Sequence, residues 1–385
     1  MTSRIKTVFW ALLKFSITGE ALPDTIKNDF DANMLKPLFV LSKRHDVTHL
    51  IADALDKNNL FFNEDDTRSR FLRERDISVY RYEKINYEYQ EVCKVLEAEK
   101  ISFLPLKGSI LRVYYPEPWM RTSCDVDILI QEQDLKRISD VLSNQLNFTA
   151  GEIGKNDANF YAPSGVHFEF RYRLSGLTEQ AQEVVSRIWL FAKPRGGVQL
   201  FLTDEMFYFY HIEHMAEHFS SSGCGIRFFL DVWILNNNLK IDRNILEGYL
   251  KDAGMNRFEK AVQDAVGYWF DNKEKTAIVD EIESYVLNAG LYGIMENRVV
   301  NHQRRNGGKA RYLISRVFLS YDELKYKYPL LKTYPILYPF YQIKRWLKFF
   351  KKDTKTRALH ELEETRNGDK NKQERVVNLL KNLGL

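Results

Sequence analysis

The sequence has few cysteines and no long apolar run. Its three cysteines, Cys93, Cys124 and Cys224, are far apart and form no CxxC pair, which argues against a disulfide framework and fits a reducing compartment. No stretch approaches the roughly 18 to 20 apolar residues of a membrane-spanning helix. The short run VFWALL near the N-terminus is followed by Lys14 and has no small-residue cleavage pattern, so we expect an amphipathic helix and no signal peptide. A cytoplasmic protein without a transmembrane segment is expected.

The sequence also lacks a strong charge bias. A net charge of +4 over 385 residues does not predict nucleic-acid binding by the whole chain, so any basic surface must be local. The contents of 44% hydrophobic, 28% charged and 14% aromatic residues are those of a globular protein.

Apolar spacing divides the chain into regions. Residues 1–100 have helical periodicity, and so does the chain after 203, whereas short β-branched or alternating segments lie between them: ISFLPL, DVDILI, a hairpin NFYAP to VHFEFRY, and GVQLFL. We therefore predict an α+β fold, with a small mixed β-sheet flanked by N-terminal and C-terminal helical regions. The expected regions are 1–95 (helical), 96–202 (core), 203–360 (helical domain) and 361–385, a polar tail poorly ordered between Glu363 and Arg375.

Three carboxylates are the main candidates for chemistry. Asp125 and Asp127 are two apart on the predicted strand DVDILI, so their side chains project from one face. Glu169 lies on the polar face of the later strand VHFEFRY. Such carboxylates repel one another unless a cation or protons neutralise them, and a hard divalent ion such as Mg²⁺ or Mn²⁺ suits their oxygens. The simpler interpretation of Asp-Val-Asp alone is a solvated strand start.

A possible phosphate site precedes these carboxylates. Gly108 and Ser109 join a predicted strand to a helix, and glycine lets a phosphate approach the backbone at a helix N-terminus. Lys107 and Arg121 could add positive charge there.

These segments together resemble a known family. LKGSILRVYYPEPWMRTSCDVDILI and VHFEFRYRL are similar to segments of the bacterial "uncharacterised nucleotidyltransferase" family, within the DNA polymerase beta-like superfamily, and the resemblance covers roughly residues 35–290. The family more often has His-Trp where Arg171-Tyr172 stand here. The resemblance implies a nucleotidyltransferase core, metal ligation by the three carboxylates, and triphosphate binding by Gly108 and Ser109.

The function that this resemblance implies is Mg²⁺-dependent transfer of a nucleoside monophosphate from an NTP to an acceptor. Glu169 would complete the metal site and help to activate the acceptor. The acceptor stays open between tRNA, a protein and a small molecule. A catalytically silent nucleotide-binding or scaffold module is an alternative.

The segment HMAEH offers a competing site. His214, Glu217 and His218 match the inverted zinc-protease pattern, and a zinc-dependent hydrolase would need a third ligand. The same segment and the following FLDVWIL resemble a second signature of the nucleotidyltransferase family. In that interpretation four residues line the acceptor cleft or contact the residues that line it: His214, His218, Arg227 and Asp231.

A basic aromatic stretch occupies residues 338–357. RNA contact through its basic side chains is one interpretation; binding to an anionic membrane surface and packing of a C-terminal helix on the body are the others. The side chains concerned are Lys344, Arg345, Lys348, Lys351 and Lys352.

Overall fold

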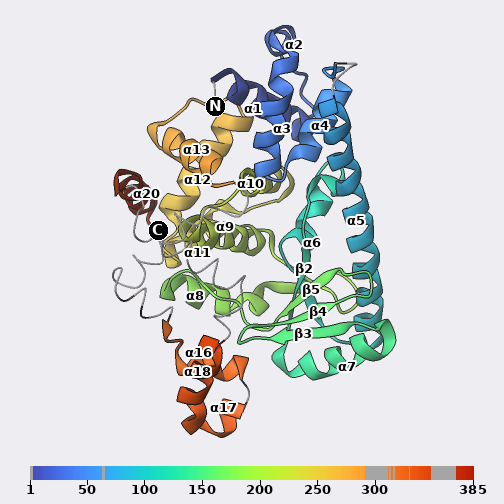
Figure 1. Cartoon of the computed structure of the whole chain (residues 1–385), viewed down its shortest axis with the longest axis vertical. Coiled ribbons are helices and arrows are strands. Elements are labelled where there is room, and N and C mark those ends of the chain that lie inside the picture. Colours follow the sequence, from blue (N-terminus) through green and yellow to red (C-terminus); the bar gives the residue numbers. More distant parts are fainter. Residues whose placement is uncertain are drawn as a thin grey trace.

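Helices occupy both ends of the described chain, and a small mixed sheet lies between them (Figure 1). The computed structural model describes residues 3–62, 66–290, 311, 314, 317–328, 330–347 and 370–385. The predicted α+β fold with helical regions on both sides of the sheet is confirmed.

The N-terminal region is helical, as its apolar spacing predicted. Its helices are α1 (Ser3–Thr18), α2 (Asp24–Asp29), α3 (Leu35–Arg44), α4 (Thr48–Lys57) and α5 (Asp66–Ala98). α1 is the amphipathic helix expected around VFWALL, and it buries Val8, Phe9 and Leu12. α5 has 33 residues and runs along one side of the molecule from the N-terminal helices to the sheet (Figure 1).

A five-stranded sheet forms the middle of the chain. Its strands are β1 (Phe103–Pro105), β2 (Asp125–Ile130), β3 (Thr149–Ile153), β4 (Asp157–Tyr161) and β5 (His167–Arg171), in the order β1-β2-β5-β4-β3. β2 and β5 are parallel and the other neighbours are antiparallel. The predicted strand in DVDILI and the predicted hairpin are confirmed. GVQLFL contains β7 (Leu200–Leu202), which pairs with β6 (Ala192–Pro194) in a separate two-stranded sheet.

The two faces of the sheet differ because side chains alternate along each strand. One face is apolar and packs on α5 and on α7 (Leu135–Leu146). Its residues on the two central strands are Val126, Ile128, Ile130, Phe168 and Phe170. The other face carries the acidic side chains of these strands and Leu129, which belongs to the larger core of the molecule.

The helices after the sheet share that larger core. They are α8 (Glu179–Ser186), α9 (Asp204–Ser221), α10 (Ile226–Asn238), α11 (Arg243–Asp252), α12 (Asn256–Phe270) and α13 (Ala277–Ala289). One apolar cluster includes residues of α1, α4, β2, α9 and α12, so the regions predicted as 1–95, 96–202 and 203–360 are packed on one another. Their boundaries stay predictions.

The last described helices form two groups. α16 (Tyr321–Lys327), α17 (Leu330–Thr333) and α18 (Tyr338–Leu347) pack around Leu324, Leu331 and Tyr341. α20 (Lys370–Leu383) packs on α12 and α13 instead. The segment expected to be a polar tail therefore ends in a helix with a buried side, because its apolar residues recur at helical spacing. None of the described helices is long and apolar enough to cross a membrane.

Candidate active site

Three acidic side chains on neighbouring strands lie on one face of the sheet. In the parallel pair of β2 and β5, Asp127 stands opposite Glu169 and Asp125 stands opposite His167. Because alternate residues of a strand project to the same side, all three carboxylates project away from the face that packs on α5 and α7. Asp127 is buried, and Asp125 and Glu169 are half-buried.

Two cationic side chains neutralise this acidic face. Lys107 Nζ lies 2.7 Å from Asp127 Oδ1, and Arg171 Nε lies 3.0 Å from the same oxygen. Arg171 Nη2 also lies 2.6 Å from Glu169 Oε1, so its guanidinium bridges the two carboxylates. The sequence analysis predicted a triphosphate contact for Lys107 and assigned no role to Arg171. The structure shows both as partners of the carboxylates.

The pKa shifts follow from this arrangement. Burial alone would raise the pKa of Asp127, but the charges and hydrogen bonds of Lys107 and Arg171 hold it below its usual value. Burial raises the pKa of Glu169 against the attraction of Arg171, and the neighbouring Asp127 adds to the rise. Asp127 is therefore the more firmly ionised of the two.

The Gly108-Ser109 segment lies directly before these strands. Gly108 begins α6 (Gly108–Leu111), a helix of only four residues, and a 3-10 turn follows at Arg112–Tyr114. A Cβ atom at Gly108 would lie 3.2 Å from Ser123 Cβ, a tight contact that favours glycine there. Ser109 Oγ is buried and has no hydrogen-bond partner among the described residues. Lys107 has a φ of +49°, a conformation that non-glycine residues rarely adopt.

Arg112 is a residue that the sequence analysis missed. Its Nε donates to the carbonyl oxygen of Gly108 at 2.8 Å, and its Nη2 donates to Ser123 Oγ at 2.6 Å. It is buried, and burial lowers its pKa to about 10. Its position four residues after Gly108 was the available signal, because that spacing suits a contact with the start of a helix.

α9 brings its histidines close to the carboxylates. His214 and His218 share a hydrogen bond between their Nε2 atoms at 3.1 Å. Burial and the charge of Lys107 lower the pKa of His214 well below its usual value and lower that of His218 to about 4. Tyr210, on the same helix, is also buried, and burial raises the pKa of its hydroxyl. The charges of Arg171 and Asp127 act on this pKa as well, so Tyr210 lies near them. α9 thus presents neutral side chains to the charged cluster.

A family comparison covers all of these elements. The model of a family described as "Uncharacterised nucleotidyltransferase" matches residues 35–271, more than half of the chain. The chain belongs to this family. Searches of curated proteins and of solved structures found no match to the chain.

In this nucleotidyltransferase-family chain, Arg121 and Asp231 form a buried ion pair. Arg121 Nε donates to Asp231 Oδ1 at 2.6 Å, and Tyr115 Oη donates to the same oxygen at 2.7 Å. Asp231 is completely buried. Arg227, which the sequence analysis placed at or behind the acceptor cleft, lies 3.1 Å from Asp46 Oδ2. Both arginines connect helical regions to the loop before β2.

Among the described residues, no three His, Cys, Asp or Glu side chains are arranged to hold a metal ion. His214 and His218 thus find no third ligand for zinc there, and Glu217 is exposed. The carboxylates Asp127 and Glu169 already hold Arg171.

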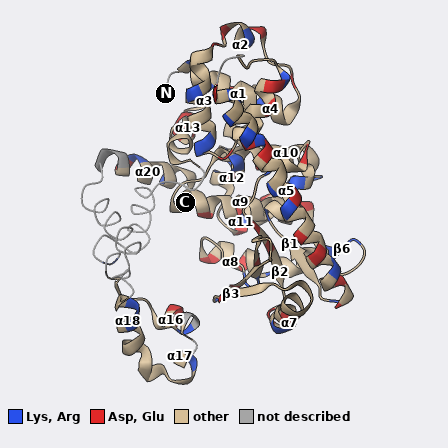
Figure 2. Ribbon diagram, turned by 45° about the vertical axis from the view of Figure 1, so that its right-hand side comes forward, with Lys and Arg blue, Asp and Glu red and all other residues tan. Residues whose placement is uncertain are grey.

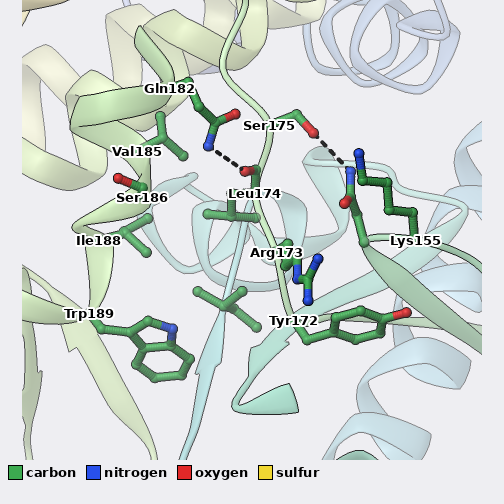
Figure 3. Close-up of a pocket in the computed structure, with 12 residues that line it drawn as sticks. Lys155, Tyr172, Arg173, Leu174, Ser175, Gln182, Val185, Ser186, Ile188 and Trp189 are labelled. Atoms are coloured by element: carbon green, nitrogen blue, oxygen red, sulfur yellow. Dashed lines mark hydrogen bonds between the residues drawn. The ribbon is translucent and has the colours of Figure 1, made fainter. Parts of the chain in front are cut away.

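A cavity of about 400 Å³ lies at the C-terminal ends of the parallel strands β2 and β5 (Figure 3). It is bordered by Leu129, two residues after Asp127, and by Tyr172 to Ser175, which follow Arg171 directly. The labelled side chain of Trp189 forms one of its sides (Figure 3). Gln182 Nε2 donates to the carbonyl oxygen of Leu174 at 3.1 Å and ties α8 to this border.

The basic side chains proposed for RNA are only partly described. Arg345 Nη1 donates to the carbonyl oxygen of Val317 at 2.7 Å, and Lys344 Nζ lies 5.6 Å from the centre of the Tyr341 ring. Lys348, Lys351 and Lys352 lie outside the described residues. Elsewhere, Lys and Arg are interspersed with Asp and Glu over the described part of the chain (Figure 2).

Proposed function

We propose that the protein transfers a nucleoside monophosphate from an NTP to an acceptor molecule. The observation that carries this proposal is the acidic face of β2 and β5 directly after Gly108 and Ser109, in a chain of the nucleotidyltransferase family. The unpartnered Ser109 Oγ is a hydroxyl that a phosphate oxygen would satisfy. Cytoplasmic location is part of the proposal.

Mg²⁺ or Mn²⁺ is the proposed cofactor, because carboxylate oxygens are the ligands that these ions prefer. Bound together with the NTP, the ion would neutralise phosphate charge. In the arrangement of the structure the ion does not fit, since Lys107 and Arg171 hold Asp127, and Arg171 also holds Glu169. Without the ion, Gly108 and Ser109 would bind the phosphate groups of the NTP, and Lys107 would neutralise part of the phosphate charge.

The acceptor is proposed to enter the cavity at the C-terminal ends of β2 and β5. This cavity combines the aromatic side chain of Trp189 with polar groups of Asn156, Ser175 and Gln182, which suits part of a polar acceptor. RNA, protein and small-molecule acceptors stay open.

The test is incubation with each labelled NTP, a divalent cation and cell extract. Asp125→Asn is the variant of choice, because Asp127 neutralises two half-buried cations, whereas the structure shows no ion pair for Asp125 among the described residues. We expect Asp125→Asn to abolish labelling and the exposed control Glu152→Gln to retain it. Labelling that persists in Asp125→Asn would contradict the mechanism. NTP binding by wild-type protein with no labelled product would favour the silent binding module.

A further inference from the structure

Exposed hydrophobic side chains are concentrated in the small group of helices α16, α17 and α18. This group has a core of its own, around Leu324, Leu331 and Tyr341, and lies at one end of the molecule (Figure 1). Of the large hydrophobic side chains that are exposed in the described part of the chain, half belong to residues 314–347. Monomeric proteins rarely expose such side chains close together, so this concentration marks a binding surface.

One side of α18 is an exposed apolar face, made of Phe340, Ile343 and Leu347. These residues are three and four positions apart, so they lie on the same side of the helix, and each is more than half exposed. The opposite side of α18 packs inward through the buried Tyr341. Ile336, in the 3-10 turn before α18, is 86% exposed. The helix is therefore amphipathic with its apolar face towards solvent.

The charges of this part of the chain have one sign. Residues 324–352 contain eight Lys or Arg and no Asp or Glu. Among the described residues of this stretch, Lys332 and Lys344 are exposed. Asp322, which precedes the stretch, is paired with Lys325 at 2.6 Å. The surface that carries the apolar face is therefore also basic, and it is complementary to a partner that is both apolar and anionic.

A membrane that contains anionic lipid has both properties. Lys and Arg near its surface are attracted by the lipid headgroups, and the apolar face of an amphipathic helix enters the boundary between headgroups and acyl chains. RNA would use the same positive charges, but it binds single-stranded sites by stacking bases on aromatic rings. It offers no partner to aliphatic side chains such as Ile336, Ile343 and Leu347. The exposed face therefore fits a lipid surface better than RNA.

We propose that α18 binds the protein to the surface of an anionic membrane. The helix lies in the plane of the interface, with Phe340, Ile343 and Leu347 among the headgroups and Lys344 close to the lipid phosphates. None of these residues belongs to the acidic face of β2 and β5 or lines the cavity, so the inference does not depend on the proposed transfer reaction.

The test is co-sedimentation of the full-length protein with vesicles, in the absence of NTP and acceptor. We expect binding to phosphatidylcholine vesicles that contain about 30% phosphatidylserine, and much weaker binding to vesicles of phosphatidylcholine alone. Ile343→Ser should lower the partition coefficient on the mixed vesicles by about tenfold, because it removes apolar area that leaves water on binding. Ile245→Ser on α11 is the matched control, since Ile245 is also an exposed isoleucine on a helix. It should bind as wild type does.

Two further variants test the same face independently. Phe340→Ser should also weaken binding by about tenfold, and Lys344→Gln by about fivefold on the mixed vesicles only. Failure of the wild type to bind the mixed vesicles, or equal binding by wild type and the folded variants, would overturn the proposal. In that case, retention of a single-stranded oligoribonucleotide would assign the basic surface to RNA. A dimer that Ile343→Ser dissociates would instead assign the apolar face to a second copy of the chain.

Discussion

Among single residues, Glu213 on α9 combines near-complete burial with an acidic side chain. It is 1% exposed, and its Oε1 accepts a hydrogen bond from the backbone N–H of Leu177 at 2.7 Å. Burial raises its pKa to about 8. The folded protein therefore holds a proton that the unfolded chain has already lost between about pH 4.5 and pH 8. The contribution of the protonated Glu213 to the free energy of unfolding is fully present below about pH 4.5, and it is lost as the pH rises through 8.

Glu213→Gln tests this linkage, because glutamine keeps the oxygen that accepts from Leu177 and cannot ionise. We expect similar free energies of unfolding for variant and wild type near pH 5, and a variant more stable by at least about 1 kcal/mol at pH 8.5. Urea denaturation at intervals from pH 5 to 8.5 measures the difference. The exposed Glu217, one turn later, gives the control Glu217→Gln. Parallel pH profiles of Glu213→Gln and wild type would show that Glu213 ionises normally.

The acidic residues of the site could be predicted, whereas their partners could not. The two-residue period of a strand is enough to place Asp125 and Asp127 on one face. The contact of Asp127 with Arg171 depends on the register of β2 and β5, which are separated by α7, β3 and β4, and its contact with Lys107 depends on the pairing of β1 with β2. No local pattern in the sequence carries that register. Arg121 illustrates the same limit, because its partner Asp231 is 110 residues away.

At the scale of elements, local chemistry decided which segments were predicted well. DVDILI and VHFEFRY alternate or run apolar over the length of a strand, and both form strands. The helix expected after Ser109 is shorter than its spacing suggested. Tyr115 is extended, with φ of −74° and ψ of 153°, because it precedes Pro116, and a residue before proline is disfavoured in a helix.

The turn after α8 borders the cavity, and it provides a test of acceptor entry. Trp189 lines the cavity, whereas the next residue, Leu190, is 75% exposed and is not among the lining residues. We expect Trp189→Ala to lower labelling of the acceptor by about fivefold, equivalent to about 1 kcal/mol of lost contact. Leu190→Ala should label as wild type does. Labelling is compared at equal amounts of folded protein, since Trp189 also packs against the core. Equal labelling by both variants would show that the acceptor does not bind in this cavity.

Over the whole molecule, the regions that composition separates are joined by packing. The indole rings of Trp10 on α1 and Trp269 on α12 stack with centroids 4.3 Å apart, and Trp10 Nε1 donates to Glu283 Oε1 on α13 at 2.9 Å. Contacts between residues more than 250 positions apart have no local signature, so the sequence could not predict that the larger apolar cluster would join residues of all three regions. The helical regions therefore support the sheet that carries the candidate site.

α20 belongs to this shared core, and its contribution can be measured. Leu380 is completely buried on the cluster that includes α12 and α13, whereas the adjacent Lys381 is exposed. Removing a buried leucine side chain leaves a cavity, so we expect Leu380→Ala to lower the free energy of unfolding by about 2–5 kcal/mol. Lys381→Ala should change it by less than about 0.5 kcal/mol. Urea denaturation followed by tryptophan fluorescence measures both, because Trp269 lies on α12, against which α20 packs. If Leu380→Ala unfolds at the same urea concentration as wild type, α20 does not stabilise the core. Packing between the N-terminal and C-terminal regions would then rest on other contacts, such as those of α1 with α12.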